Sequence, residues 1–158
     1  MKGEAVLFSK KSDDWATPPE LYGRLHREFS FDLDAAADGK NAKCLAYLGP
    51  GSILAEDALA APWHSWGHKS IWCNPPYSQV GAFLAKAAEA VAAGATVVML
   101  LPARTDTKWW HTYVWEEENA RPRPGVEVRF IRGRLRFGDS TNSAPFPSVV
   151  VVFRGKRR

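Results

Sequence analysis

The sequence has few cysteines, no long apolar run and no secretory leader, and each absence excludes a class of protein. Cys44 and Cys73 are the only cysteines among 158 residues, which is too few for a disulfide framework and typical of a reducing cytoplasm. The longest apolar stretch, around 96–101, is too short to span a bilayer. No charged segment followed by apolar residues opens the chain, so no secretion is expected. We therefore expect a cytoplasmic protein with no membrane partner.

The composition is that of one ordinary globular domain. Hydrophobic residues make up 46% of the chain and charged residues 24%. A chain of this length can bury one hydrophobic core, so neither intrinsic disorder nor a disulfide-bonded miniprotein fits. We expect a mobile polar segment over 1–14 and a single domain over 15–158.

Positive charge is concentrated in the last quarter of the sequence. Residues 1–120 contain 11 Lys and Arg against 15 Asp and Glu, whereas residues 121–158 contain 10 against 2. Such an asymmetry favours one face that binds a polyanion. The alternative is a basic tail that serves only solubility, above all for Lys156, Arg157 and Arg158.

Apolar spacing predicts alternating helices and strands, with no internal repeat. A helix is expected directly after Thr17, which would act as its N-cap while Glu20 completes a capping box. Strands are predicted over 31–36, 70–73, 96–101, 126–131 and 148–153. Two further helices are predicted over 80–93 and 106–118. This order predicts a doubly wound α/β sheet, trimmed to fit a short chain.

The tetrapeptide Asn74-Pro75-Pro76-Tyr77 follows a predicted buried strand, at the end where open α/β sheets bind ligands. Two prolines fix the backbone and remove two N–H donors. The turn then presents carbonyl oxygens, the Asn74 side-chain oxygen and an aromatic ring, which together suit a planar group that carries an NH₂. If that amine accepts a methyl group, carbonyl dipoles and the Tyr77 ring stabilise the positive charge that develops on nitrogen. The alternative is a Pro-Pro loop that merely ends a strand.

Further segments accompany the tetrapeptide in a fixed order. They are Asp13–Glu20, Phe31–Ala37, Asn41–Cys44, Asp57 with Trp63, Asn74–Ser78, Leu101–Thr107 and Asn142–Ser148. In this set the chain resembles the short Dam-type family of phage DNA N6-adenine methyltransferases. The tetrapeptide alone is widely shared, but the ordered set extends from 13 to 153 and is much more specific. The resemblance implies a Rossmann-like methyltransferase fold, with a mostly parallel twisted sheet and a terminal antiparallel strand.

The resemblance also implies S-adenosylmethionine as the methyl donor. Thr17 and Pro18 match the element that holds the donor's methionine end, and Asp34, followed by Ala35, matches the position that binds its amino group. Asp57 matches the position that contacts the donor's adenine amine. From the residues alone, Asp34 could instead be a strand-end cap and Asp57 a helix N-cap.

One part of the family pattern is absent. A glycine-rich loop usually follows the first strand of a methyltransferase, whereas this chain has alanine at 35, 36 and 37 before Asp38 and Gly39. No clear acidic residue for the donor's ribose hydroxyls stands out, and Asp38 is the nearest candidate.

The candidate DNA contacts lie late in the chain. Arg132, Arg134 and Arg136 alternate with apolar residues, so an extended segment would direct three guanidinium groups to one side. The alternative is a charged edge strand that resists aggregation. By resemblance, Phe146 in the loop 138–147 would stack on an adenine flipped out of the duplex, although a phenylalanine there could also be core. Arg104 follows the strand over 96–101, on the expected ligand side.

A zinc site was also considered. Cys44, His64, His68 and Cys73 could form a zinc set, but no Cys-x₂-Cys pair accompanies them, so no metal is expected.

The expected reaction is methylation of adenine N6 in double-stranded DNA, in the host cytoplasm if the protein is phage-encoded. The alternatives are an amine methyltransferase that acts on RNA or on a protein glutamine, and a non-catalytic α/β module that binds nucleic acid. Because no large target-recognition domain fits, site choice would come from loops, from the basic C-terminal third or from a homodimer.

Overall fold

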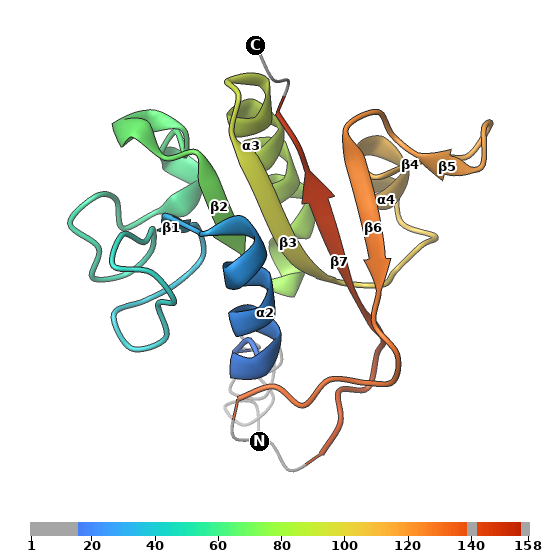
Figure 1. Ribbon diagram of the computed structural model, residues 1–158, viewed down its shortest axis with the longest axis horizontal. Coiled ribbons are helices and arrows are strands. Elements are labelled where there is room, and N and C mark those ends of the chain that lie inside the picture. Colours follow the sequence, from blue (N-terminus) through green and yellow to red (C-terminus); the bar gives the residue numbers. More distant parts are fainter. Residues whose placement is uncertain (1–15, 139–141, 156–158) are drawn as a thin grey trace, which may run out of the picture.

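The protein, described here by a computed structural model over residues 16–138 and 142–155, is built on a five-stranded sheet (Figure 1). The strands lie in the order β1-β2-β3-β7-β6. Their bounds are β1 Leu33–Asp34, β2 Ser70–Cys73, β3 Thr96–Pro102, β6 Val126–Phe130 and β7 Ser148–Phe153. β1, β2 and β3 are parallel, whereas β7 is antiparallel to both of its neighbours, β3 and β6. The predicted mixed α/β sheet is confirmed, and its reversed strand lies inside the sheet with β6 at the edge.

Helices and short turns fill the connections. Their bounds are α2 Pro19–Phe29, η1 Ala58–Ala60, η2 Ser65–Gly67, η3 Tyr77–Gln79, α3 Val80–Ala92 and α4 Lys108–Tyr113, with a small hairpin of β4 Trp115–Glu116 and β5 Arg121–Pro122. The segment 1–14 and the basic residues 156–158, about which the sequence made predictions, lie outside the described residues.

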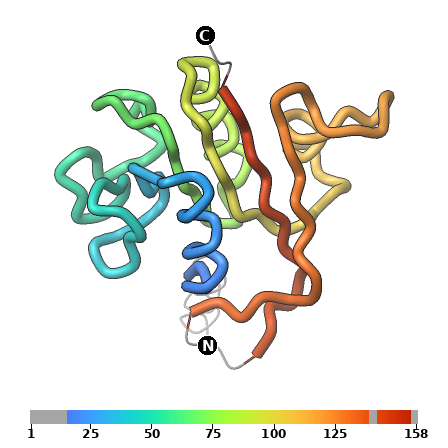
Figure 2. The backbone as a smooth tube through the Cα atoms, in the orientation of Figure 1, coloured from blue at the N-terminus to red at the C-terminus, as the bar shows by residue number. Residues whose placement is uncertain are grey.

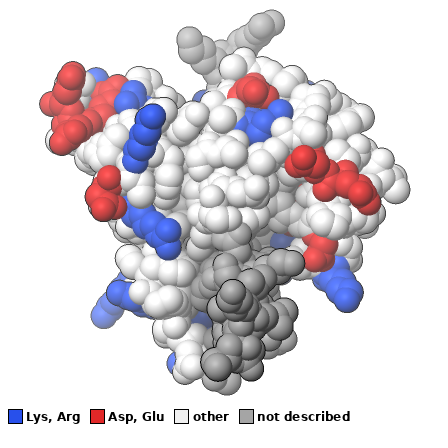
Figure 3. Space-filling view, turned by 180° about the vertical axis from the view of Figure 1, so that it is seen from behind, with Lys and Arg blue, Asp and Glu red and all other residues white. Residues whose placement is uncertain are grey.

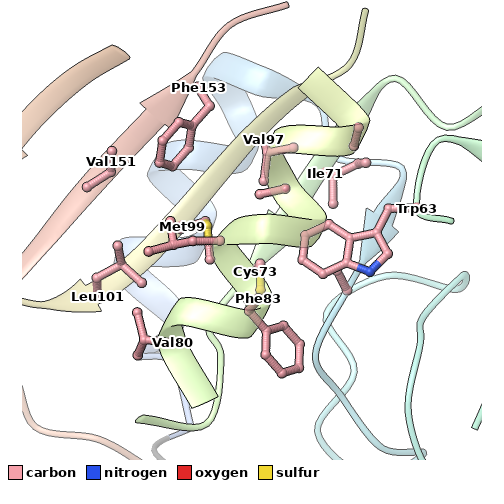
Figure 4. Packing of buried hydrophobic residues seen from close by; sticks show 14 of the residues in the cluster. Trp63, Ile71, Cys73, Val80, Phe83, Val97, Met99, Leu101, Val151 and Phe153 are labelled. Carbon is pink, nitrogen blue, oxygen red and sulfur yellow. The ribbon is translucent and has the colours of Figure 1, made fainter. Parts of the chain in front are cut away.

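The sheet is covered on both faces, because side chains along a strand alternate between them. Val97 and Met99 on β3 belong to the core that includes α3, and Figure 4 shows them beside that helix together with Phe83. Val98 and Leu100 belong to the core on the opposite face, which includes the apolar side of α2. The unbroken apolar sequence of β3 therefore reflects burial on both faces of the sheet.

The helix predicted over 106–118 is wrong beyond residue 113. The N–H of Val114 still donates to the carbonyl of Trp110 at 2.9 Å. The carbonyl of Val114, however, accepts from the N–H of Arg123 at 2.8 Å, so the chain turns into the β4–β5 hairpin instead of adding another helical turn.

The capping box predicted at the start of α2 is also wrong. Pro18 holds the N-cap position, and no side chain caps the helix. Thr17 is buried, and its hydroxyl accepts a hydrogen bond from Nδ2 of Asn74 at 3.0 Å. A residue far away in the sequence thus uses the hydroxyl that the local pattern assigned to the helix.

Strand β1 is shorter than the predicted 31–36, although the chain stays close to β2 on either side of it. The N–H of Asp32 donates to Ser70 O at 2.8 Å, and the N–H of Ala35 donates to Trp72 O at 2.9 Å. The parallel arrangement therefore brings the chain after Asp34 and the chain after Cys73 to the same end of the sheet.

The start of α2 and the connection from β6 to β7 also lie at that end (Figure 2). The N–H of Gly138 donates to the carbonyl of Ala16 at 3.0 Å, which joins the two segments directly. No helix in the described part of the chain combines the length and apolar character that crossing a membrane requires.

Candidate functional site

A cavity of about 320 Å³ opens where β1 and β2 end. Four stretches of chain contribute to it: the loop after β1, the segment around 49, the approach to η1, and the turn that leads into α3. The lining residues are Ala36, Ala37, Asp38, Asn41, Leu48, Gly49, Pro50, Glu56, Asp57, Ala58, Asn74, Pro76, Gln79 and Phe83. The wall combines three carboxylates with apolar and amide side chains, so it suits a ligand that has both polar and apolar parts.

In the tetrapeptide Asn74-Pro75-Pro76-Tyr77, the first three residues form the bend between β2 and η3, and Tyr77 begins η3. Asn74 and Pro76 line the cavity, while Pro75 is buried. The hydrogen bond from Asn74 Nδ2 to Thr17 Oγ1 holds the amide against the start of α2. The bend thus presents an oriented amide at the end of the central strands.

Tyr77 is the centre of a small aromatic group. Its ring meets Phe146 edge-on at 5.1 Å between centroids and Phe137 at 6.4 Å, and these two phenylalanines lie 6.1 Å apart. Burial raises the pKa of the Tyr77 hydroxyl far above its ordinary value, and the charge of Arg104 opposes that shift. The phenol therefore stays neutral at physiological pH and offers a ring rather than a base.

Asp34 is a buried carboxylate that binds the loop after β1. Its Oδ1 accepts from the N–H of Ala36 at 3.2 Å, and its Oδ2 accepts from the N–H of Lys43 at 3.0 Å. Burial raises the pKa of Asp34 to about 6, although both N–H groups and the charge of Lys43 favour the ionised form. Neither Asp34 nor Ala35 is among the residues that line the cavity. Asp34 instead binds both ends of the loop after β1, and the middle of that loop lines the cavity.

Within that loop, Asp38 and Asn41 bind each other's backbone. Asp38 Oδ1 accepts from the N–H groups of Lys40 and Asn41 at 2.8 and 3.0 Å, and Asn41 Oδ1 accepts from the N–H of Asp38 at 2.8 Å. These bonds give the loop a defined shape without the glycine-rich sequence of the general methyltransferase pattern.

Asp57 is the N-cap that was considered for it, and it also lies in the cavity wall. Its Oδ1 accepts from the N–H of Leu59 at 2.9 Å and so caps η1, and the residue also lines the cavity. Thr17 and Pro18 do not line the cavity, and Thr17 reaches it only through Asn74.

The arginines proposed for DNA are all exposed. Arg132, Arg134 and Arg136 follow the end of β6 in a segment that is not a strand, so the charged edge strand considered as the alternative is not formed there. The alternation nevertheless persists, because Leu135 is half-buried and Phe137 is buried. The three guanidinium groups are therefore separated from the core side of this segment.

Comparison with known proteins decides the family. A family model described as DNA N-6-adenine-methyltransferase (Dam) matches residues 5–157. The chain belongs to this family. A Haemophilus phage HP1 protein named DNA N-6-adenine-methyltransferase is 31% identical over 153 residues, which cover 94% of this chain and 83% of that protein. An Escherichia phage T1 protein of the same name is 36% identical over 100 residues, which cover 62% of this chain but only 39% of the phage T1 protein.

The cavity of this Dam-family protein is also lined by residues that sequence reasoning missed. Glu56, Gln79 and Phe83 line the cavity but carry no pattern of their own in the sequence. Asn41 gave a weak signal, since it begins one of the segments that carry the resemblance. Glu56 adds a second carboxylate directly beside Asp57, in the part of the wall that approaches η1.

The residues considered for zinc are not assembled into a site. Cys73 lies in the hydrophobic core, Cys44 is in hydrogen-bond contact with the Tyr22 hydroxyl, and His68 lies 3.5 Å from a carboxylate oxygen of Asp32. Within residues 16–138 and 142–155, no three His, Cys, Asp or Glu side chains are grouped as a metal would require.

Proposed function

We propose that this Dam-family protein transfers a methyl group from S-adenosylmethionine to N6 of adenine in double-stranded DNA. The observation that carries the proposal is the Asn74–Tyr77 bend, which joins a carboxylate-lined cavity to an aromatic group at the end of the parallel strands. The names of the phage HP1 and phage T1 relatives support the same base and the same atom. The reversed strand β7 beside three parallel strands supports a Rossmann-like methyltransferase fold.

The cavity fits the proposed donor in size and in chemistry. Its volume of about 320 Å³ lies at the lower end of the range for small-molecule sites. We assign Asp57 to the donor's adenine amine, and Asp38 or Glu56 to the ribose hydroxyls, because carboxylates accept hydrogen bonds from both groups. Leu48 and Phe83 supply apolar contact for the rings.

The methionine end of the donor is assigned by resemblance. Pro18, Asp34 and Ala35 are proposed to shape this end, with Asp34 acting through the loop that it binds. When bound, S-adenosylmethionine would supply the electrophilic methyl group.

The acceptor amine is proposed to lie against the bend. Asn74 Oδ1 and the carbonyl of Pro75 would accept hydrogen bonds from the two N6 hydrogens, which localises the nitrogen lone pair. As the methyl group transfers, these dipoles and the Tyr77 ring stabilise the positive charge on N6. A neutral amide is no strong base, so the proton would leave to water afterwards. Phe146, already in contact with Tyr77, would provide a second surface for the flipped base.

Phosphate contacts are assigned to the same end of the molecule. Arg104 lies close enough to Tyr77 to affect its pKa, and Arg132, Arg134 and Arg136 are exposed on the connection to β7. On the face seen in Figure 3, Lys and Arg are scattered among Asp and Glu and form no single basic patch on the part that is not grey. A homodimer would double the number of these arginines along the duplex.

The first test uses the purified protein, radiolabelled S-adenosylmethionine and unmodified plasmid DNA, with nucleosides separated by chromatography. Label in N6-methyladenine is the expected result. Label in N4-methylcytosine would keep the chemistry and overturn the base. Donor binding without DNA labelling would favour RNA or protein glutamine as substrate, and absence of donor binding would favour a non-catalytic nucleic-acid module.

The second test is Asn74→Ala. Donor affinity measured by calorimetry should stay near the wild-type value, while turnover falls by about two to three orders of magnitude, since removal of such a polar group costs roughly 3–4 kcal/mol of transition-state stabilisation. Asn119→Ala, in the exposed connection between β4 and β5, is the matched control. Near-wild-type methylation by Asn74→Ala would refute the mechanism.

A further inference from the structure

The Thr17 hydroxyl binds neither the helix that follows it nor the cavity, the two roles expected from the sequence. Thr17 is 5% exposed and lies directly before Pro18, the N-cap residue of α2, yet it does not cap that helix. It is also absent from the cavity wall, where a residue that holds the donor would lie. Its hydroxyl instead accepts from Nδ2 of Asn74, a residue 57 positions later in the chain, at 3.0 Å.

We infer that Thr17 is a positioning residue that orients the Asn74 amide for the acceptor base, and not a contact for the methyl donor. The inference rests on the proposed function, because it concerns the amide that would accept hydrogen bonds from adenine N6. It assigns to Thr17 an effect on turnover that is separate from donor affinity.

The orientation matters because the two ends of an amide have nearly the same shape and opposite hydrogen-bonding character. An amine that presents N–H groups needs the oxygen, and an amide turned by 180° would direct its own N–H groups at them. In the structure the Thr17 hydroxyl accepts from Nδ2, and this contact holds the amide in the orientation in which Oδ1 can be the acceptor for the base.

The position of Thr17 is itself fixed from both sides. Pro18, with φ −58°, is followed by the first residue of α2, which is also proline, so the backbone after Thr17 has little freedom. Before Thr17, the carbonyl of Ala16 accepts from the N–H of Gly138. A hydroxyl on such a restrained segment can hold a partner in one geometry, as preorganised sites require.

The test compares Thr17→Val, which keeps the shape and removes the hydroxyl, with Thr17→Ser, which keeps the hydroxyl. Thr17→Val should lower kcat about tenfold or more, the size expected from loss of one buried hydrogen bond with a misdirected amide. The Kd for S-adenosylmethionine alone, measured by calorimetry, should change less than about twofold. Thr17→Ser should retain most of kcat. Thr112→Val, which removes an exposed threonine hydroxyl on α4, is the control.

Two further measurements separate positioning from general damage. In ¹⁵N-labelled protein, the Asn74 side-chain NH₂ signal, identified by its loss in Asn74→Ala, should shift in Thr17→Val and stay in place in Thr17→Ser. The double variant Thr17→Val/Asn74→Ala should be no slower than Asn74→Ala alone, because a positioning residue has nothing left to orient.

The outcomes distinguish the inference from the proposed function. If the wild-type protein methylates DNA but Thr17→Val keeps the wild-type kcat, or loses only donor affinity, the inference is overturned and the function stands. Additive losses in the double variant would also overturn it. If the wild-type protein methylates no acceptor, the proposed function fails, whatever the NMR signal of Asn74 shows.

Discussion

Asp34→Asn should remove a pH dependence of folding stability that the wild-type protein carries. Burial raises the pKa of Asp34 from 3.8 to about 6, so the folded state keeps the proton to a higher pH than the unfolded state. The stability contributed by the protonated form is therefore fully present below pH 3.8, and it is lost as the pH rises through about 6. The groups that interact with the carboxyl are the Lys43 and Ala36 N–H groups, Tyr22 on α2, Cys73 on β2 and Cys44.

The size of the effect follows from the shift. A pKa difference of about two units corresponds to about 3 kcal/mol over the whole range, with about half of it lost between pH 5 and pH 8. The protein tolerates this cost at neutral pH because the ionised carboxylate binds both ends of the loop that lines the cavity. The free energy of unfolding that is lost when Asp34 ionises is thus linked to the loop that shapes the candidate donor site.

The assay is urea unfolding, followed by tryptophan fluorescence, at several pH values from 5 to 8. The free energy of unfolding of wild type should fall relative to that of Asp34→Asn by about 1.5 kcal/mol across this range. Asp106→Asn, at an exposed position, is the matched control and should run parallel to wild type. Identical pH profiles for wild type and Asp34→Asn would refute the reasoning, since they would mean that Asp34 is ionised to the same extent in the folded and unfolded states.

Two further predictions concern ligand binding. Changing Arg132, Arg134 and Arg136 together to Gln should reduce the slope of log Kd for DNA against log salt, by up to about 0.9 for each phosphate that is no longer neutralised; an unchanged slope would assign these arginines to solubility. Asp57→Asn should weaken binding of S-adenosylmethionine about tenfold while the Kd for DNA stays unchanged, because the carboxylate lines the cavity and not the aromatic group. Unaltered donor affinity would restrict Asp57 to its cap on η1.

Most of the sheet could be predicted from the sequence, because its central strands are buried on both faces. β3 is an apolar run between Gly94 and Pro102, and β2 ends where two prolines exclude both strand and helix. Family membership could be predicted too, because the matching segments occur in one order along nearly the whole chain. The strands could be predicted because their residue patterns are local, and the family because many matching segments occur along the chain.

The errors have the opposite cause, a partner that lies outside the few residues of a local pattern, from 9 to 57 positions away. The pattern of Thr17 and Glu20 is a good capping box, but Asn74 takes the hydroxyl. The helix predicted over 106–118 has acceptable helix formers, but Arg123 takes the carbonyl that the next turn would need. Asp34 binds the end of its loop through the N–H of Lys43, nine residues later, and no periodicity in the sequence predicts this hydrogen bond.

The loop after β1 lacks the glycines of the general pattern, and the glycine that its fold requires lies instead at Gly49. The N–H of Ala37 donates to Leu48 O at 3.0 Å, so this loop and the chain at 48–49 run side by side. Gly49 has φ +139°, and a Cβ there would overlap the backbone carbonyl of Ala37. Gly49→Ala should therefore lower Tm and weaken S-adenosylmethionine binding at least about tenfold, since both segments line the cavity. Gly23→Ala on α2, where a Cβ meets nothing within 4 Å, should leave donor affinity unchanged. Wild-type donor affinity in Gly49→Ala would mean that this loop does not form the donor site.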